Sequence, residues 1–226
     1  MKVWAVVGAI HAAGFGLVAA YALGRPELIG LAALAYLLGL RPGFDPDHIL
    51  AIDNATRRQL RGGPIGLSFS LGHSTVVVAV VVAAGLGLGV LPSSSLGAAV
   101  SGSALCALGV GNLTLLRGRR GRLDRAFSRV GKAWHLYPLG LVFGLGFDTA
   151  SVLALVLITA RSPLPVVLAI PLVFSAGMTL IDSADAAAME RAYRRALPIR
   201  RWNLALTSVS ATLALAFGAF ELSTLL

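Results

Sequence analysis

Charged residues and cysteine are both scarce in this chain. Only 13% of its 226 residues are charged and 57% are apolar, whereas an ordinary soluble domain has roughly 25% and 45–50%. The single cysteine, Cys106, excludes an internal disulfide framework and a metal-binding thiolate cluster. No Gly-x4-Gly-Lys-Ser/Thr phosphate loop occurs, so the chain itself does not hydrolyse ATP. The composition therefore predicts an integral membrane protein whose chemistry uses neither thiols nor nucleotides.

The apolar residues gather into seven stretches long enough to cross a bilayer. A helix of about 20 residues spans the roughly 30 Å of hydrocarbon. We therefore predict an all-α polytopic membrane protein in which residues 1–226 form a single transmembrane domain. The predicted spans are Val3–Leu23, Leu28–Ile52, Ile65–Val90, Leu96–Leu116, Leu136–Ala160, Val166–Met189 and Trp202–Leu225.

Basic residues lie mostly in the gaps between these spans. The net charge of +9 alone would be compatible with nucleic-acid binding. However, 16 of the 19 Lys and Arg residues lie at the amino terminus or in alternate loops, as the positive-inside rule describes for cytoplasmic segments. We therefore predict a multi-pass protein of the cytoplasmic (inner) membrane that contacts lipid and no nucleic acid. Its amino terminus would lie inside and its carboxyl terminus outside.

The second span is unusually polar. Four ionisable residues fall within eight positions, namely Arg41, Asp45, Asp47 and His48. Each costs roughly 2.5–3.5 kcal/mol at the centre of a membrane helix. Pro42, Gly43 and Pro46 lie in the same stretch, and such residues break a helix beside a cavity or a buried polar site. We predict a broken second helix that turns these side chains toward a hydrated cation site. A structural explanation stays open, in which the arginine pairs with the first aspartate and the histidine caps a carbonyl.

Polar clusters also interrupt three later spans. They are His73 with Ser74 and Thr75 in the third span, Asp148 with Thr149 in the fifth, and Asp182, Ser183 and Asp185 in the sixth. Asp182 and Asp185 are three residues apart, so they share a helix face and would repel each other unless a cation or proton lay between them. These spans therefore supply further candidate ligands for a cation.

A tripeptide of the second span recurs in the fifth. Gly43-Phe44-Asp45 is matched by Gly146-Phe147-Asp148, three spans later and therefore running in the opposite direction. We interpret this echo as the trace of an inverted repeat, an arrangement common in secondary transporters.

Imidazole, carboxylate and carbonyl groups without thiolate suit nickel, cobalt, zinc or manganese. The metal would be a transported substrate, Ni²⁺ or Co²⁺ first, and no prosthetic group is expected. The candidate ligands are Asp45, Asp47, His48, His73, Asp148, Asp182, Asp185 and, in the first span, His11. The candidate supporting residues are Arg41, Asp53, Asn54, Ser74, Thr75, Thr149 and Ser183.

These residues resemble the NiCoT nickel/cobalt permeases. The hallmark of that family is Arg-His-Ala-Phe-Asp-Ala-Asp-His-Ile followed by Ala-Ile-Asp-Asn-Thr-Thr-Arg. The corresponding stretches here are Arg41-Pro-Gly-Phe-Asp-Pro-Asp-His-Ile49 and Ala51-Ile-Asp-Asn-Ala-Thr-Arg57. Further family signatures are matched by Leu71–Val76, Leu145–Ala150 and Gly177–Asp185. The resemblance implies a membrane transporter of a divalent transition metal. We predict secondary uptake driven by the membrane potential, because an entering divalent cation gains about 4.6 kcal/mol per 100 mV.

The sequence departs from the family pattern at several points. Pro42 stands where the family has the first histidine of its metal motif, so the resemblance does not imply high-affinity nickel binding, and His11 is the candidate replacement. Val152 replaces a glutamate and Ala186 a glycine. Family members generally have eight spans with both termini inside, one more than predicted here.

Three alternatives to uptake stay open. The first is efflux in exchange for protons. The second is a membrane acyltransferase that uses the His-x4-Asp pair His48 and Asp53, although side chains five apart on a helix diverge by about 140°. The third is a metal-binding subunit of a larger complex. In it, a second copy or a small membrane protein covers the face of the bundle that an eighth helix covers in other family members.

Overall fold

A computed structural model describes residues 2–23, 25–59, 62–88, 94–116, 136–145, 149–159, 162–196 and 200–225. These ranges are almost entirely helical and contain no β-strand, so the predicted all-α fold is confirmed. The elements are α1 (Lys2–Ala22), α2 (Glu27–Leu40), the 3₁₀ turn η1 (Arg41–Phe44), α3 (Pro46–Gln59), α4 (Gly62–Gly85), α5 (Ser94–Leu116), α7 (Tyr137–Leu145), α8 (Thr149–Thr159), α9 (Leu164–Ala196) and α10 (Arg200–Ser223).

Six helical segments of the described chain are long and apolar enough to cross a membrane. They correspond to the predicted spans except for the fifth, Leu136–Ala160. That span consists of two shorter helices, α7 with 9 residues and α8 with 11, which flank residues 146–148 outside the described ranges. The sixth predicted span is longer than expected, because α9 continues to Ala196.

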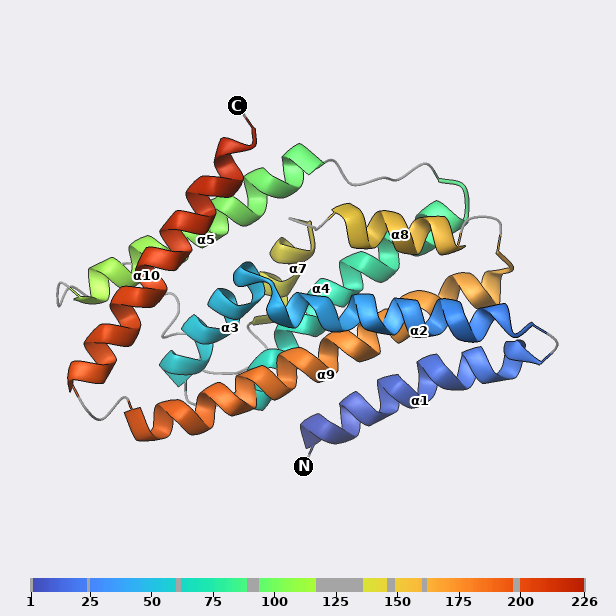
Figure 1. Cartoon of the computed structure of the whole chain (residues 1–226), viewed down its shortest axis with the longest axis horizontal. Coiled ribbons are helices and arrows are strands. Elements are labelled where there is room, and N and C mark those ends of the chain that lie inside the picture. Colours follow the sequence, from blue (N-terminus) through green and yellow to red (C-terminus); the bar gives the residue numbers. More distant parts are fainter. Residues whose placement is uncertain are drawn as a thin grey trace.

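The second span is broken where the sequence predicts it. α2 ends at Leu40, the turn η1 follows, and Asp45 has an extended backbone with φ −81° and ψ 132°. Pro46 opens α3, a position that suits proline because the first helical N–H has no partner within the helix. The Asp45 carbonyl accepts a hydrogen bond from the Ile49 N–H at 3.1 Å, so a new helix begins directly after the break. As a result, α3 takes a direction different from that of α2 (Figure 1).

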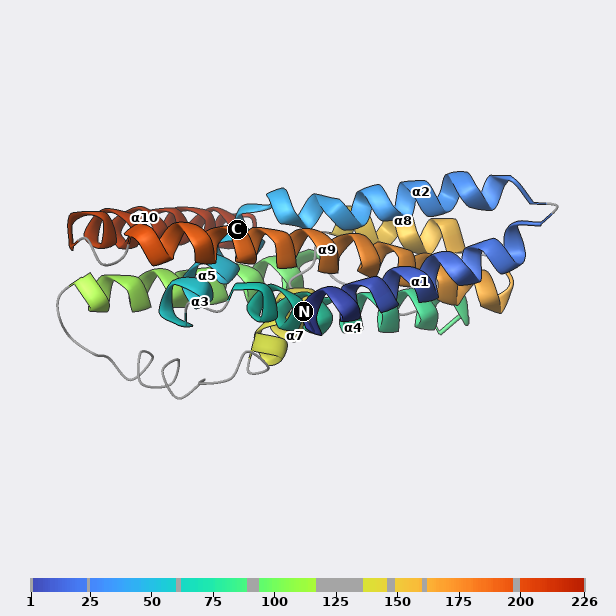
Figure 2. The ribbon, with the colours of Figure 1, turned by 90° about the horizontal axis from the view of Figure 1, so that it is seen from below.

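Helices α4 and α9 lie side by side in opposite directions through the middle of the molecule, and α5 lies against α10 at one end (Figures 1 and 2). Helices α1 and α2 pack on α9, while α7 packs on α4. One apolar cluster, around Phe174, Met178 and Val81, fills the space between α2, α4 and α9. A second, around Phe69, Ile65 and Leu105, lies between α3, α4 and α5.

Helices α2 and α9 approach each other backbone to backbone. A Cβ atom added at Gly39 would overlap the carbonyl oxygen of Phe174, and one added at Gly177 would overlap that of Tyr36. Only glycine permits this reciprocal contact, because any side chain would force the two helices apart.

The same contact recurs between α7 and α4. A Cβ atom at Gly140 would overlap the carbonyl oxygen of Phe69, and one at Gly72 would overlap that of Tyr137. Helices α2 and α7 therefore share a Tyr-x-x-Gly sequence, and α4 and α9 share Phe-Ser-x-Gly. Equivalent helices lie three spans apart, and α4 and α9 run in opposite directions (Figure 1). This correspondence is stronger than the tripeptide echo, yet it becomes visible only once the contacts align the two segments.

Candidate metal site

Two imidazoles and one carboxylate from three helices meet beside the break in the second span. His48 lies in the first turn of α3, His73 in the middle of α4 and Asp182 in the middle of α9. The Nδ1 atom of His48 lies 3.5 Å from Oδ2 of Asp182, and the two imidazole ring centroids are 4.7 Å apart. Their exposed fractions are 2%, 5% and 0%, respectively. The structure thus brings together candidate ligands from the second, third and sixth predicted spans.

An apolar wall closes one side of this cluster. The ring of Phe69 meets the His48 ring edge to face with centroids 5.0 Å apart, and Phe143 lies behind it at 5.6 Å. Apolar side chains lower the local dielectric constant, which strengthens any attraction between the Asp182 carboxylate and a cation.

Several buried polar atoms on the same three helices have no hydrogen-bonding partner within the described part of the chain. They include both carboxylate oxygens of Asp182 and the hydroxyls of Ser183, Ser74, Ser68 and Thr56. A buried polar group without a partner costs about 1–3 kcal/mol, so most proteins avoid it unless a ligand or ordered water uses the atom. The arrangement is therefore suited to bind a cation or water.

The other acidic candidates lie around the cluster and are less buried. The Asp45 carboxylate lies 4.0 Å from Nε of Arg41, and the Asp47 carboxylate accepts a hydrogen bond from the His48 backbone N–H at 2.9 Å. Asp185 lies one turn beyond Asp182 on α9 and is half-buried. Among the residues that the structure describes, no group of three or more His, Cys, Asp or Glu side chains is arranged to hold a metal ion.

The two candidates of the fifth predicted span, Asp148 and Thr149, lie where the described residues resume after a gap. Asp148 lies outside the described residues, and for Thr149 the backbone of α8 is described but the side chain is not. Of the third-span neighbours, Ser74 is buried, whereas Thr75 is exposed and shares a 2.9 Å hydrogen bond with the Tyr137 hydroxyl.

His11 is not brought to the cluster. Its Nδ1 lies 2.8 Å from the Val7 carbonyl oxygen and its Nε2 lies 3.2 Å from the Tyr36 hydroxyl, so both ring nitrogens interact within α1 and α2. Pro42 is buried in η1, where its carbonyl accepts a hydrogen bond from the Asp45 N–H. The structure therefore gives His11 a packing role between two helices and does not place it as a substitute for the histidine absent at position 42.

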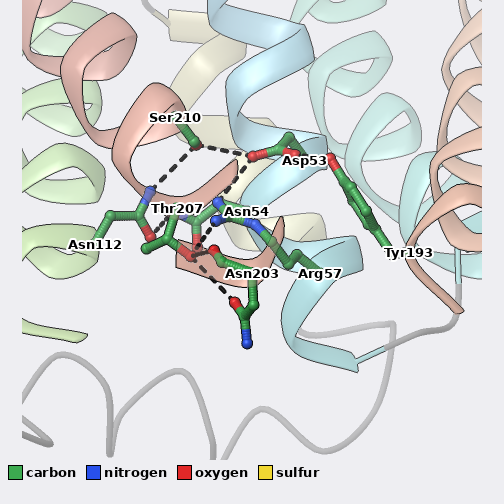
Figure 3. A network of polar contacts seen from close by, with 8 residues as sticks. All are labelled: Asp53, Asn54, Arg57, Asn112, Tyr193, Asn203, Thr207 and Ser210. Carbon is green, nitrogen blue, oxygen red and sulfur yellow. Dashed lines mark hydrogen bonds and ion pairs between the residues drawn. The ribbon is translucent and has the colours of Figure 1, made fainter. Parts of the chain in front are cut away.

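Asp53 and Asn54 belong to a separate polar cluster farther along α3 (Figure 3). Asp53 pairs with Arg57, and it also accepts hydrogen bonds from Tyr193 and Ser210. Because His48 faces Asp182 while Asp53 faces these other partners, the two residues do not act as a general-base pair. Tyr193 and Ser210 were not among the predicted site residues. Their only signal in the sequence is that they are polar residues in or beside apolar segments.

Comparison with known proteins identifies related sequences along nearly the whole chain. The profile of the NicO family, described as high-affinity nickel-transport protein, matches residues 28–124 and 117–226. The nickel transporter NicT of Mycobacterium tuberculosis is 37% identical over 97% of this chain and 75% of its own length. The nickel transporter NixA of Staphylococcus aureus is 34% identical over 96% and 79%. The cobalt transport protein NhlF of Rhodococcus rhodochrous is 33% identical over 93% and 76%. No solved structure matches the chain.

Proposed function

Because the chain belongs to the NicO family of high-affinity nickel-transport proteins, we propose that it is a secondary transporter that carries Ni²⁺ or Co²⁺ into the cell. It is a multi-pass membrane protein of a family of transporters, and not an enzyme. The observation that carries the proposed site is the meeting of His48, His73 and Asp182 inside apolar helices.

The chemistry of these three side chains suits the proposed substrate. Neutral imidazole nitrogens bind nickel and cobalt well, and a carboxylate supplies negative charge against the dication. Transport must also release the ion, which favours a few moderately strong ligands over a closed cage. Asp45, Asp47, Asp148 and Asp185 stay candidate metal ligands, and we propose that they act along the path to and from this centre, because each lies in a polar stretch of the second, fifth or sixth predicted span.

The reciprocal glycine contacts support an inverted repeat. The first unit would comprise α2 to α5 and the second α7 to α10, with Gly39 equivalent to Gly140 and Gly177 to Gly72. In this description His48 and His73 come from the first unit and Asp182 from the second. A small rotation of one unit against the other would therefore open the site alternately to the two sides of the membrane.

The proposed driving force is the membrane potential. A charge gains about 2.3 kcal/mol per 100 mV, so an entering divalent cation gains about 4.6 kcal/mol. We propose that the protein lies in the cytoplasmic membrane with its amino terminus inside, and that residues 1–226 act as one domain. A homo-oligomer or a small membrane partner stays a prediction, which mass determination of the detergent-solubilised protein tests.

Uptake of radiolabelled nickel and cobalt into proteoliposomes tests the proposal. We expect His48→Ala and His73→Ala to lose most uptake, while Glu190→Gln keeps wild-type uptake because Glu190 pairs with Arg194 near the carboxyl end of α9. Wild-type uptake by both histidine variants would show that the site assignment is wrong. No flux with wild-type protein at any potential would reject the transport function itself.

A further inference from the structure

α3 carries a second buried polar cluster about one and a half turns beyond His48. We call it the Asp53 cluster, and it consists of Asp53, Asn54 and Arg57 of α3, Asn112 of α5, Tyr193 of α9, and Thr207 and Ser210 of α10 (Figure 3). Asn54 and Asn112 are 2% and 1% exposed, and the other members are also largely buried. A polar group of this size inside a membrane bundle is costly unless it serves a purpose.

The charges of the Asp53 cluster are already balanced. The Asp53 carboxylate accepts hydrogen bonds from Arg57 Nη2 at 2.9 Å, from Ser210 Oγ at 2.8 Å and from the Tyr193 hydroxyl. Arg57 Nη1 donates to Thr207 Oγ1 at 2.9 Å. A cation entering here would have to displace the guanidinium, so this cluster is not a second metal site. Its charge-assisted hydrogen bonds are stronger than neutral ones and fix geometry well.

The Asp53 cluster ties α3 to three other helices. Asn54 Nδ2 donates to Asn112 Oδ1 at 3.0 Å, and Asn112 Nδ2 donates to Ser210 Oγ at 3.2 Å. The break before Pro46 ends the helical hydrogen bonding between α2 and α3, so α2 does not set the direction of α3. Apolar packing against α4 and polar side-chain contacts with α5, α9 and α10 therefore hold α3 in place.

We propose that the Asp53 cluster is a latch that holds α3 in the orientation that sets His48 beside His73 and Asp182. Asp53 is then a positioning residue for metal binding and touches no metal itself. The geometry supports this role because Asp182 and Tyr193 are eleven residues apart on α9 and so lie about 20° apart around that helix. α3 therefore contacts one face of α9 at two points, where His48 meets Asp182 and where Asp53 meets Tyr193. This inference rests on the proposed nickel site.

The latch is tested by removing hydrogen bonds while the ion pair stays intact. The double variant Tyr193→Phe/Ser210→Ala removes two of the three donors to Asp53 and leaves Arg57 in place. We expect the dissociation constant for Ni²⁺, measured by equilibrium binding to the purified protein, to rise about tenfold, as for other residues that orient a ligand. The variant Tyr193→Phe/Ser210→Thr keeps one hydroxyl and should recover part of the affinity. Tyr36→Phe, which removes a hydroxyl between α1 and α2, should bind as wild type.

Thermal melting separates positioning from general weakening of the fold. Unchanged nickel affinity in the double variant would overturn the latch, whatever its melting temperature. If the melting temperature falls, Gly39→Ala is the reference, because it strains the contact between α2 and α9 away from α3. If the double variant and Gly39→Ala melt at the same temperature, we expect the double variant to lose more nickel affinity than Gly39→Ala. Equal losses of nickel affinity would overturn the latch. Wild-type binding by His48→Ala would instead reject the site on which the latch acts.

Discussion

At the scale of single residues, Asp182 stands out because its carboxylate is fully buried and neither oxygen has a hydrogen-bonding partner in the described chain. The His48 imidazole lies close to it, with Nδ1 3.5 Å from Oδ2 of Asp182. A fully buried carboxylate destabilises the metal-free protein unless its charge is paired, and it attracts a dication strongly. Its presence is thus easier to explain by binding than by folding.

We predict that Asp182→Asn weakens nickel binding by more than about a hundredfold, since two unit charges 4 Å apart attract by about 4 kcal/mol at an effective dielectric constant of 20. The same substitution should leave the metal-free melting temperature close to that of the wild type, because it removes the cost of burying the carboxylate together with the carboxylate's 3.5 Å contact with His48. Equilibrium binding and thermal melting of the purified protein measure both effects.

His11→Gln is the matched control, since His11 also lies in an apolar span but its ring nitrogens contact Val7 of α1 and Tyr36 of α2. It should keep nickel affinity and lose some stability, about 1 kcal/mol per hydrogen bond removed. A large loss of affinity with His11→Gln and none with Asp182→Asn would contradict the assignment of the ligands.

At the scale of elements, the break in the second span was predictable and the division of the fifth was not. Two prolines and a glycine within five residues predict the first break. Proline removes a helical hydrogen bond, and glycine lowers the stability of a helix. The fifth predicted span has Pro138 near its start and glycines at positions 140, 144 and 146, a pattern that also fits a continuous membrane helix. In the described residues α7 packs on α4, and α8 packs on α4 and α9.

The close approach of α2 to α9 gives a prediction about stability. Gly39→Ala should destabilise the protein by about 1–3 kcal/mol, because the new methyl group would overlap the backbone carbonyl of Phe174. Gly30→Ala on the same helix meets nothing within 4 Å and should instead stabilise it slightly, by about 0.5–1 kcal/mol. Thermal melting in detergent compares the two. Equal effects would mean that the helices do not meet at Gly39.

At the scale of the whole molecule, the site lies where the two proposed repeat units meet. His73 comes from α4 and Asp182 from α9, and these two helices run in opposite directions side by side (Figure 1). A site shared in this way changes its exposure whenever the units rotate, whereas a site within one unit would not. The architecture therefore suits a carrier better than a static metal store.

We predict that the membrane potential drives nickel uptake by the whole molecule. In proteoliposomes with a potassium diffusion potential of about 100 mV, inside negative, nickel should accumulate toward a ratio of about two thousand, the equivalent of about 4.6 kcal/mol. Accumulation should vanish when potassium is equal on both sides. Dependence on a pH gradient and not on potential would favour proton-coupled efflux.

Much of this protein followed from its sequence alone. Long apolar stretches determine helices and their approximate ends, because a backbone in lipid must satisfy its own hydrogen bonds. Ionisable residues inside those stretches identify candidate ligands, because placing each one in the membrane costs free energy and each can be read directly from the sequence. The tertiary structure decided which of them meet. His48 and Asp53 lie five residues apart on one helix, yet one faces His73 and Asp182 while the other faces Arg57, Tyr193 and Ser210. Helix faces diverge with every residue, and only the packing of α4, α5, α9 and α10 around α3 determines what each face contacts.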